Sequence, residues 1–432
     1  MKVAYITAGA AGMYCGTCIH DNTVANVLKK QGHDVSLIPT YTPTRTDEEN
    51  VSMNRIFYGG INVYLQQKLS IFRYTPWVLD RILDKPSLLN SLARFSSSTD
   101  ARDLGKLTVS MLNAENGKQK KELQKLIKWL KENDKPDIVY LTNSMLVGMS
   151  REIKKALNVP VVCALQGEDI FLRDLIDPYK DRALEVLAER AKDADGFVAP
   201  CYYYAEFMAE EYLRVPTEKI DVVPLGVNLK GHGMIDEKAG PPPLVIGYLA
   251  RICPEKGLHH LVNAFYTLTK EIGADTVELH VAGYLGKKDE PYFEELVNQI
   301  DSWGLQERFV HYGEVNRAEK IAFFNRLHIF SMPTVYRESK GLSVLEALAN
   351  GVPVVQPQHG SFPEMVKATQ GGILVEPDSS DALAEGILQL FRDPAKRRQL
   401  GMDGKRNVHE KFNDGVIAQQ LLDVFQKYIE KT

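Results

Sequence analysis

The chain has 432 residues, 44% of them hydrophobic and 25% charged, and a formal net charge of -4 at pH 7. Such a chain is long enough for two domains with separate cores, and its small net charge gives no reason to expect nucleic-acid binding. No apolar run reaches the roughly 20 residues of a membrane span. The start of the chain, MKVAYITAGAAG, predicts a strand and a glycine loop instead of a signal peptide. The cytoplasm is therefore the expected compartment.

The first predicted elements are a strand over residues 2–8, which is a continuous apolar run, a helix over 22–30 and a strand over 35–39. Three glycines, the last of them Gly16, lie between the first strand and the helix. A glycine loop at the end of a parallel strand can hold a phosphate or a sugar. The spacing does not fit the dinucleotide fingerprint, so a nicotinamide cofactor has little support.

Cys15 and Cys18 form a C-x-x-C pair, and His20 and Asp21 follow closely. Redox or metal chemistry is one interpretation of this pattern. A zinc site normally needs a second pair of ligands, and no Cys/His pair at matching spacing occurs elsewhere in the chain. The favoured interpretation is a tight loop lined by small residues, and no metal site is predicted.

Residues 41–135 form the least regular part of the sequence, with a lysine- and leucine-rich helix predicted over 118–131. The segment 69–95 mixes aromatic residues with arginines and lysines. This composition suits a packed helix pair, and it also suits contact with a membrane surface or with an acceptor substrate. The packed helix pair is favoured, and peripheral membrane contact through 69–95 is the alternative.

A parallel strand predicted over 159–165 is followed by Gln166, Gly167, Glu168 and Asp169. Ligands of open α/β sheets gather beyond the carboxyl ends of the strands, so these polar residues are well placed for binding or chemistry. The amide of Gln166 could bridge sugar hydroxyls. The two acids either contact a ligand or cap the following helix.

A linker is predicted over residues 229–243, which contain few large apolar residues and end in Gly-Pro-Pro-Pro. We therefore expect an N-terminal domain over 1–228 and a second domain over 244–412. Asp193 and Asp195 resemble a metal-binding pair superficially, but they precede a strand and are interpreted as turn residues.

The second domain begins with a strand predicted over 245–249, a loop that contains Arg251 and Lys256, and a helix over 259–270. Two cations in front of a helix N-terminus make a plausible clamp for a diphosphate. A surface ion pair is the alternative interpretation.

Residues 331–366 predict a strand, a polar loop, a helix, a second strand and a glycine-bearing turn. Glu338 lies in the loop, and Glu346 lies on the border of the apolar stripe of the helix. A carboxylate in that position needs a partner or a ligand. Residues 341–343 form the start of the helix, where free N–H groups and the macrodipole favour an anion such as a phosphate.

Glu338, seven intervening residues and Glu346, followed by NGVPVV and a Gly-x-x-Pro-Glu turn from Gly360 to Glu364, resemble the donor-site signature of the family-4 retaining glycosyltransferases. These enzymes have the GT-B fold. The alternation of strands and helices on both sides of the linker independently favours α/β architecture. The expected fold is therefore two doubly wound Rossmann-like domains that face a cleft.

The resemblance implies a metal-independent enzyme that moves a sugar from a nucleotide-diphosphate sugar to an unidentified acceptor with retention of configuration. It needs no cofactor, and the acceptor could be a glycan, a lipid or a small molecule. The catalytic residues implied are Arg251, Lys256 and Glu338. The donor-binding residues implied are Gly16, Gln166, Gly341, Leu342, Ser343 and Glu346. The C-terminal helix, over 413–432, is expected to cross back and complete the N-terminal domain.

The sequence departs from the family pattern at three positions. Gln166 stands where many members have a histidine, Cys15 where a first loop glycine is expected, and Ala250 where a glycine usually precedes the arginine. Two alternatives therefore stay open. One is another GT-B enzyme, such as a nucleotide-sugar epimerase or a glycosyl phosphorylase, and the other is a non-catalytic nucleotide-sugar-binding protein.

Overall fold

The computed structural model describes residues 1–9, 16–73, 101–233 and 243–431. The chain divides into two compact units, Met1–Gly226 with Ile417–Thr432, and Val227–Val416. Each unit contains one six-stranded sheet, and every strand pair in both sheets is parallel. Cys15, most of the segment 69–95 and the middle of the expected linker 229–243 lie outside the described residues.

The sheet of the first unit has the strand order β2-β1-β3-β4-β5-β6. Its strands are short apolar runs that are buried almost throughout, as expected when helices cover both faces of a parallel sheet. The strands are β1 (Lys2–Thr7), β2 (Asp34–Pro39), β3 (Ile138–Leu141), β4 (Val161–Ala164), β5 (Gly196–Ala199) and β6 (Ile220–Val222). The helices are α1 (Gly16–Lys30), α2 (Gly60–Lys68), α5 (Ala101–Leu112), α6 (Lys120–Trp129), α7 (Ser150–Leu157), α8 (Asp169–Arg173), α9 (Tyr179–Arg190), α10 (Tyr202–Met208) and α18 (Asp414–Ile429).

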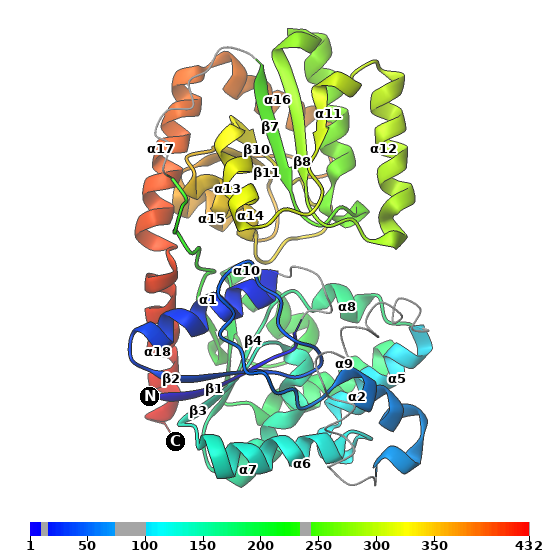
Figure 1. The fold of residues 1–432 in the computed structure, drawn as a ribbon, viewed down its shortest axis with the longest axis vertical. Coiled ribbons are helices and arrows are strands. Elements are labelled where there is room, and N and C mark those ends of the chain that lie inside the picture. Colours follow the sequence, from blue (N-terminus) through cyan, green and yellow to red (C-terminus); the bar gives the residue numbers. More distant parts are fainter. Residues whose placement is uncertain (10–15, 74–100, 234–242, 432) are drawn as a thin grey trace. The chain divides into compact units, whose positions relative to one another are not determined.

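The two faces of this sheet carry separate hydrophobic cores. In Figure 1, α1 lies on one side of the sheet and α6 and α7 lie on the other. The core on the α1 side also contains apolar residues of α18, among them Ile417, Leu421 and Phe425. Near the end of α18, Lys427 Nζ contacts both carboxylate oxygens of Asp221, at 2.6 and 2.8 Å. The last helix of the chain is therefore part of the core of the first unit.

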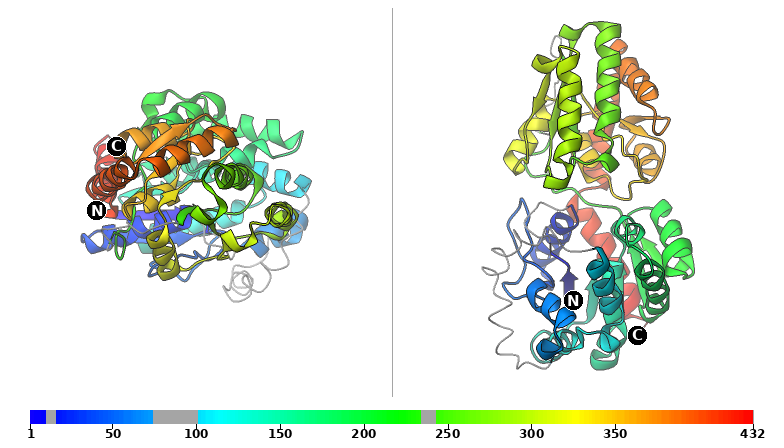
Figure 2. Two further views of the ribbon diagram at one scale, coloured as in Figure 1. Left: turned by 90° about the horizontal axis from the view of Figure 1, so that it is seen from above. Right: turned by 90° about the vertical axis from the view of Figure 1, so that its right-hand side faces the viewer.

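The sheet of the second unit has the strand order β12-β11-β10-β7-β8-β9. Helices α11 and α16 contact each other, while α14 and α15 contact α17. The right-hand view of Figure 2 looks onto α11 and α12 of this unit. The strands are β7 (Leu244–Leu249), β8 (Val277–Ala282), β9 (Phe309–His311), β10 (Ile329–Phe330), β11 (Val354–Pro357) and β12 (Gly372–Val375). The helices are α11 (Leu258–Ile272), α12 (Glu290–Ser302), α13 (Arg317–Arg326), α14 (Leu342–Ala349), α15 (Phe362–Thr369), α16 (Ser380–Arg392) and α17 (Pro394–Lys411).

The parallel doubly wound sheets confirm the expected fold class. Helix α1 begins at Gly16, six residues before the start expected from sequence, and the turn at Gly360 runs directly into α15. Helix α17 was not expected, because its sequence is mostly polar and has no apolar periodicity. It packs instead through glycines, since a Cβ atom on Gly404 would lie 2.6 Å from Leu348 Cδ2. No helix in the described ranges is long and apolar enough to cross a membrane.

Candidate functional site

The candidate donor site lies where the strand order of the second sheet reverses. Strands β7 and β10 are neighbours in the sheet. Along the chain, β7 is followed by β8 on one side of this pair, and β10 is followed by β11 on the other side. In doubly wound sheets, the loops that leave such a pair of strands diverge and open the crevice in which ligands bind. Arg251 and Lys256 follow β7, and Glu338 follows β10. The fold therefore brings two cations and a carboxylate to one end of the sheet.

Lys256, Tyr336 and Glu338 form a compact hydrogen-bonded cluster. Lys256 Nζ lies 2.5 Å from Glu338 Oε2 and 2.5 Å from the hydroxyl oxygen of Tyr336. Tyr336 also donates to Glu338 Oε2 at 2.6 Å. The side chain of Glu338 is 4% exposed and that of Lys256 is 18% exposed. The carboxylate is therefore buried but stabilised by a cation and a hydroxyl donor.

This environment changes the acidity of two groups. Burial by itself would raise the pKa of Glu338, but the charge and hydrogen bond of Lys256, with the hydroxyl of Tyr336, lower that pKa to about 2. Burial, followed by the charge of Glu338, raises the pKa of Tyr336 well above its usual range. At neutral pH, Glu338 is therefore an anion and Tyr336 is a protonated donor.

Two glycines allow the loops of this site to approach one another. Gly257 has φ +72°, and a Cβ atom there would lie 1.7 Å from Pro333 O. Gly360 has φ +59°, and a Cβ atom there would lie 2.4 Å from Glu338 O. The backbone of Glu338 is held from the same turn, because Ser361 N donates to Glu338 O at 2.7 Å. The Gly-x-x-Pro-Glu turn therefore fixes the loop that carries the first glutamate.

Helix α14 begins in the same loop. Gly341 takes the N-cap position with φ +65°, and no side chain caps the helix there. The first N–H groups of a helix have no intrahelical acceptor, so those of Gly341, Leu342 and Ser343 point away from the body of the helix and could bind an anion.

Glu346, on the first turns of α14, is paired with a buried lysine. Lys320 Nζ of α13 lies 2.6 Å from Glu346 Oε1, and both side chains are 7% exposed. The backbone oxygen of Glu346 accepts from Asn350 Nδ2 at 2.8 Å. Lys320 was not singled out from sequence, although it shares a buried helix face with Phe323 and Phe324. A lysine on an apolar stripe was the available signal.

Arg251 is exposed at the start of the loop after β7. Its Nε donates to Cys253 Sγ at 3.3 Å. No described hydrogen bond or ion pair links it to the side chains of Lys256, Tyr336 or Glu338, but its charge opposes the rise in the pKa of Tyr336. Arg251 therefore lies near the buried cluster without bonding to it.

The remaining predicted residues belong to the first unit. Gly16 is the first residue of α1 and is exposed. Gln166 follows β4 and donates to Asp21 Oδ1 at 3.0 Å. Glu168 precedes α8 but does not cap it with its side chain. Its carboxylate accepts from Ser144 N at 2.7 Å and from Gln166 N at 2.5 Å, so it braces the loop. Asp169 accepts from the hydroxyl of Tyr204 at 2.8 Å.

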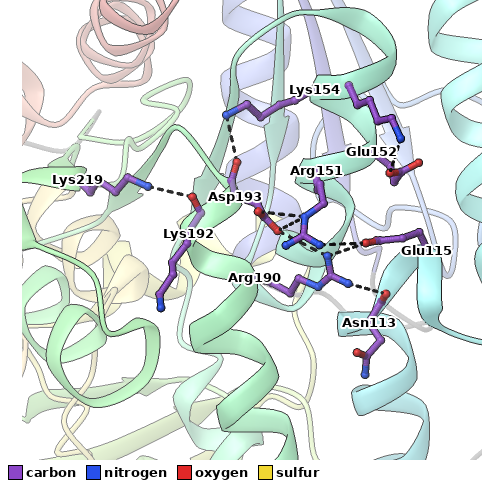
Figure 3. Close-up of polar contacts among 10 residues, drawn as sticks. Asn113, Glu115, Arg151, Glu152, Lys154, Arg190, Lys192, Asp193 and Lys219 are labelled. Atoms are coloured by element: carbon purple, nitrogen blue, oxygen red, sulfur yellow. Dashed lines mark hydrogen bonds and ion pairs between the residues drawn. The ribbon is translucent and has the colours of Figure 1, made fainter.

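Asp193 lies in an ion-pair network between helices of the first unit (Figure 3). Its carboxylate contacts Arg151 Nε at 3.1 Å and Arg190 Nη1 at 3.6 Å. Arg190, 2% exposed, also contacts Glu115 Oε1 at 2.9 Å. Asp195 pairs with Lys154 at 2.6 Å. Both carboxylates are thus engaged by cations, and no cluster of metal-ligating side chains occurs among the described residues.

Two family models match the chain. The model described as Glycosyl transferases group 1 matches residues 235–407. The model described as Glycosyltransferase Family 4 matches residues 105–230. Together the two models cover most of the second unit and about half of the first.

Individual proteins of known name or structure are also similar to this chain. An uncharacterized glycosyltransferase of Methanocaldococcus jannaschii is 22% identical over 100% of this chain and 99% of its own length. Several other curated relatives match over only about half of their own length. The solved structure of sucrose-phosphate synthase from Thermosynechococcus elongatus has a TM-score of 0.71 at 16% identity and covers 100% of both chains. Anabaena HepE in complex with UDP-glucose has a TM-score of 0.67 at 17% identity and covers 99% of this chain and 100% of that one.

Proposed function

The chain belongs to the group 1/family 4 glycosyltransferases, has the GT-B fold and uses a nucleotide-sugar donor, and from this premise we propose that it transfers the sugar with retention of configuration and without a metal ion. The observation that carries the proposal is the cluster of Lys256, Tyr336 and Glu338 at the reversal point of the second sheet. This cluster supplies a cation and an anion beside the N-terminus of α14, where a diphosphate and a sugar hydroxyl would each find a partner.

In the proposed reaction, the bond between the anomeric carbon and the leaving phosphate oxygen breaks, and a bond from the acceptor hydroxyl forms on the same face. The acceptor's proton passes to the leaving phosphate oxygen. Negative charge therefore grows on the diphosphate. Arg251, Lys256 and the N–H groups at 341–343 would stabilise that charge, which is the interaction that lowers the barrier most effectively. Because these cations are side chains, no metal ion is needed.

Two glutamates would bind the rest of the donor. We assign Glu338 to the hydroxyls of the donor sugar, where its negative charge also stabilises positive charge that develops at the anomeric carbon. We assign Glu346 to the ribose hydroxyls. Its Oε1 is held by Lys320 at 2.6 Å, so this ion pair would fix the carboxylate and leave Oε2 for the ribose. The binding of the donor by Gly16 and Gln166 stays a prediction from the family resemblance.

A thermal-shift screen with UDP-glucose, GDP-mannose and related nucleotide sugars tests the donor. A ligand present at 100 times its dissociation constant stabilises the native state by about 2.7 kcal/mol, which should raise the melting temperature of a domain of this size by roughly 5–10 °C. Turnover of the selected donor with free phosphate or with an acceptor panel then separates a phosphorylase from a transferase. Binding without any turnover would favour a binding protein.

The ribose assignment has its own test by calorimetry with UDP and 2′,3′-dideoxy-UDP, or with the matching pair for the base selected. The variant Lys320→Met/Glu346→Gln removes the charges together, so neither is left buried alone. We expect the wild type to prefer the ribose nucleotide and the double variant to lose that preference. An unchanged preference would refute the role of Glu346.

The diphosphate clamp is tested by Arg251→Ala and Lys256→Ala. Both variants should chiefly slow turnover, and normal rates in both would refute the clamp.

A further inference from the structure

Asp21 of α1 is a fully buried carboxylate at the carboxyl end of the first sheet. Four side chains donate to its two oxygens. Tyr5 donates to Oδ1 at 2.8 Å, Thr7 to Oδ2 at 2.8 Å, and Gln166 Nε2 to Oδ1 at 3.0 Å. The hydroxyl of Thr142 is the fourth donor, to Oδ2. The donors thus come from three adjacent strands, since Tyr5 and Thr7 lie on β1, Thr142 follows β3, and Gln166 follows β4.

The direction of these hydrogen bonds fixes the orientation of the Gln166 amide. A carboxylate oxygen only accepts, so the hydrogen of the Thr142 hydroxyl is used on Asp21. The Thr142 oxygen is then an acceptor toward Gln166 Nε2, which lies 3.2 Å away. Both amide hydrogens of Gln166 are therefore engaged. A flipped amide would set its carbonyl oxygen against two acceptors and lose both bonds.

The carbonyl oxygen is left as the one group of the Gln166 side chain that can bind something else. Gln166 Oε1 is buried and receives no hydrogen bond from the described residues. A buried carbonyl without a donor is costly. Its position is also significant, because the order of the first sheet reverses between β1 and β3. Thr7 ends β1, Thr142 follows β3, and ligands of such sheets bind beyond this pair of strand ends.

We propose that Asp21 is a positioning residue that fixes the amide of Gln166 so that its carbonyl Oε1 accepts a hydrogen bond from a sugar hydroxyl. The proposal rests on the proposed function, because it takes the ligand to be a sugar. It assigns to an Asp–Gln pair the position at which many family members use a histidine. The hydroxyl belongs either to the transferred sugar or to the acceptor.

The test compares Asp21→Asn, Gln166→Leu and the double variant in kinetics with UDP-glucose, or with another donor that the wild type turns over. In Asp21→Asn, the new amide donates to Thr142, which frees the Thr142 hydroxyl to donate to Gln166, so the amide can flip. Each single variant should lose roughly tenfold in kcat/KM, the effect of one hydrogen bond. The double variant should lose no more than Gln166→Leu alone, because Asp21 acts through the amide.

The matched control is Glu122→Gln. Glu122 is also fully buried in the first unit and accepts from Asn62 at 3.0 Å and from Gln66 at 2.7 Å. It lies on α6 and is also paired with Lys125 Nζ, at 2.8 Å. This variant should keep its kinetic constants. If Asp21→Asn merely behaved like Glu122→Gln, or if the effects of Asp21→Asn and Gln166→Leu were additive, Asp21 would have only a structural role.

Two measurements identify the molecule that supplies the hydroxyl. Weaker binding of UDP-glucose with unchanged binding of UDP assigns it to the donor sugar, whereas a raised KM for the acceptor at saturating donor assigns it to the acceptor. A wild type that binds no nucleotide sugar would instead refute the proposed function.

The orientation of the Gln166 amide is tested by NMR, with its side-chain signals identified by their loss in Gln166→Leu. Slow hydrogen exchange in the wild type and faster exchange in Asp21→Asn supports the proposal, and equal exchange overturns it.

Discussion

Replacing Lys256 by methionine tests the ion pair at the centre of the candidate donor site. The substitution keeps the length of the side chain and removes the ammonium that lies 2.5 Å from Glu338 Oε2. Tyr336 and the backbone N–H of Lys340 would remain as donors to the carboxylate. The variant therefore leaves a buried anion with hydrogen bonds but without its cation.

The expected magnitude follows from the acidity of Glu338. Its pKa is lowered from 4.5 to about 2 in the native state. At about 1.4 kcal/mol for each pH unit, this shift corresponds to about 3 kcal/mol of stability. Because the native pKa is the lower one, the contribution is present above pH 4.5 and is lost as the pH falls toward 2. Breaking a buried pair by removing one partner typically costs about 3–5 kcal/mol, so the two arguments agree.

In the variant, the contribution of Glu338 to stability changes sign. Burial, which opposes ionisation, is no longer outweighed by Lys256, so we expect the native pKa of Glu338 to rise above its unfolded value. The variant should then be less stable than the wild type by about 3 kcal/mol at pH 7, and the difference should shrink as the pH falls through 4.5. The double variant Lys256→Met/Glu338→Gln removes the anion as well and should recover most of the loss at pH 7.

Urea unfolding at pH 7 and pH 4 measures these differences. Trp303 stacks on Tyr266 in the second unit, with ring centroids 4.1 Å apart. In a background in which Trp77 and Trp129 are phenylalanine, its fluorescence reports on that unit alone. A coupling energy below about 1 kcal/mol between the two substitutions, or a loss of stability that does not depend on pH, would refute the assignment of the low pKa to Lys256.

Two further substitutions test the packing around the two units. Gly257→Ala places a Cβ atom 1.7 Å from Pro333 O at φ +72° and should cost about 3 kcal/mol or more in urea unfolding; Gly304→Ala, at φ +71° with no atom within 4 Å, should cost only about 1 kcal/mol, and equal losses would contradict the close-approach argument. Arg190→Met removes a buried guanidinium that lies 2.9 Å from Glu115 Oε1 and should cost about 3–5 kcal/mol. Addition of Glu115→Gln should recover part of that loss, and no recovery would refute the pairing.

Much of the architecture could be predicted from sequence, because buried parallel strands are continuous apolar runs. The helix predicted within residues 331–366 is α14, and the C-terminal helix expected over 413–432 is α18, whose apolar residues repeat at helical spacing. Helix α17 could not be predicted in this way, since it packs through Gly401 and Gly404 instead of an apolar stripe. Glycines add little to a hydrophobic pattern, so their spacing does not predict a helix.

The sequence predicted the two glutamates of the site but not all of the side chains that bind them. Glu338 and Glu346 were recognised by a family signature, which fixes their positions in sequence. Tyr336 was not, because a tyrosine in a loop indicates no direction for its side chain. Lys320 was missed although it lies on a buried helix face. Asp21 was considered with the cysteine pair, and its four donors come from residues as far apart as Tyr5 and Gln166. Only the strand order brings such residues together.

The place of α18 in the core of the first unit has a consequence for synthesis on the ribosome. Residues 1–226 leave the ribosome first, but the apolar surface that α18 covers stays open until about 200 further residues have been added. At about 5–20 residues per second, that interval lasts roughly 10–40 seconds. The second unit can therefore complete its core before the first unit does. Until α18 is made, the apolar surface beside β1 and α1 stays exposed and can bind chaperones.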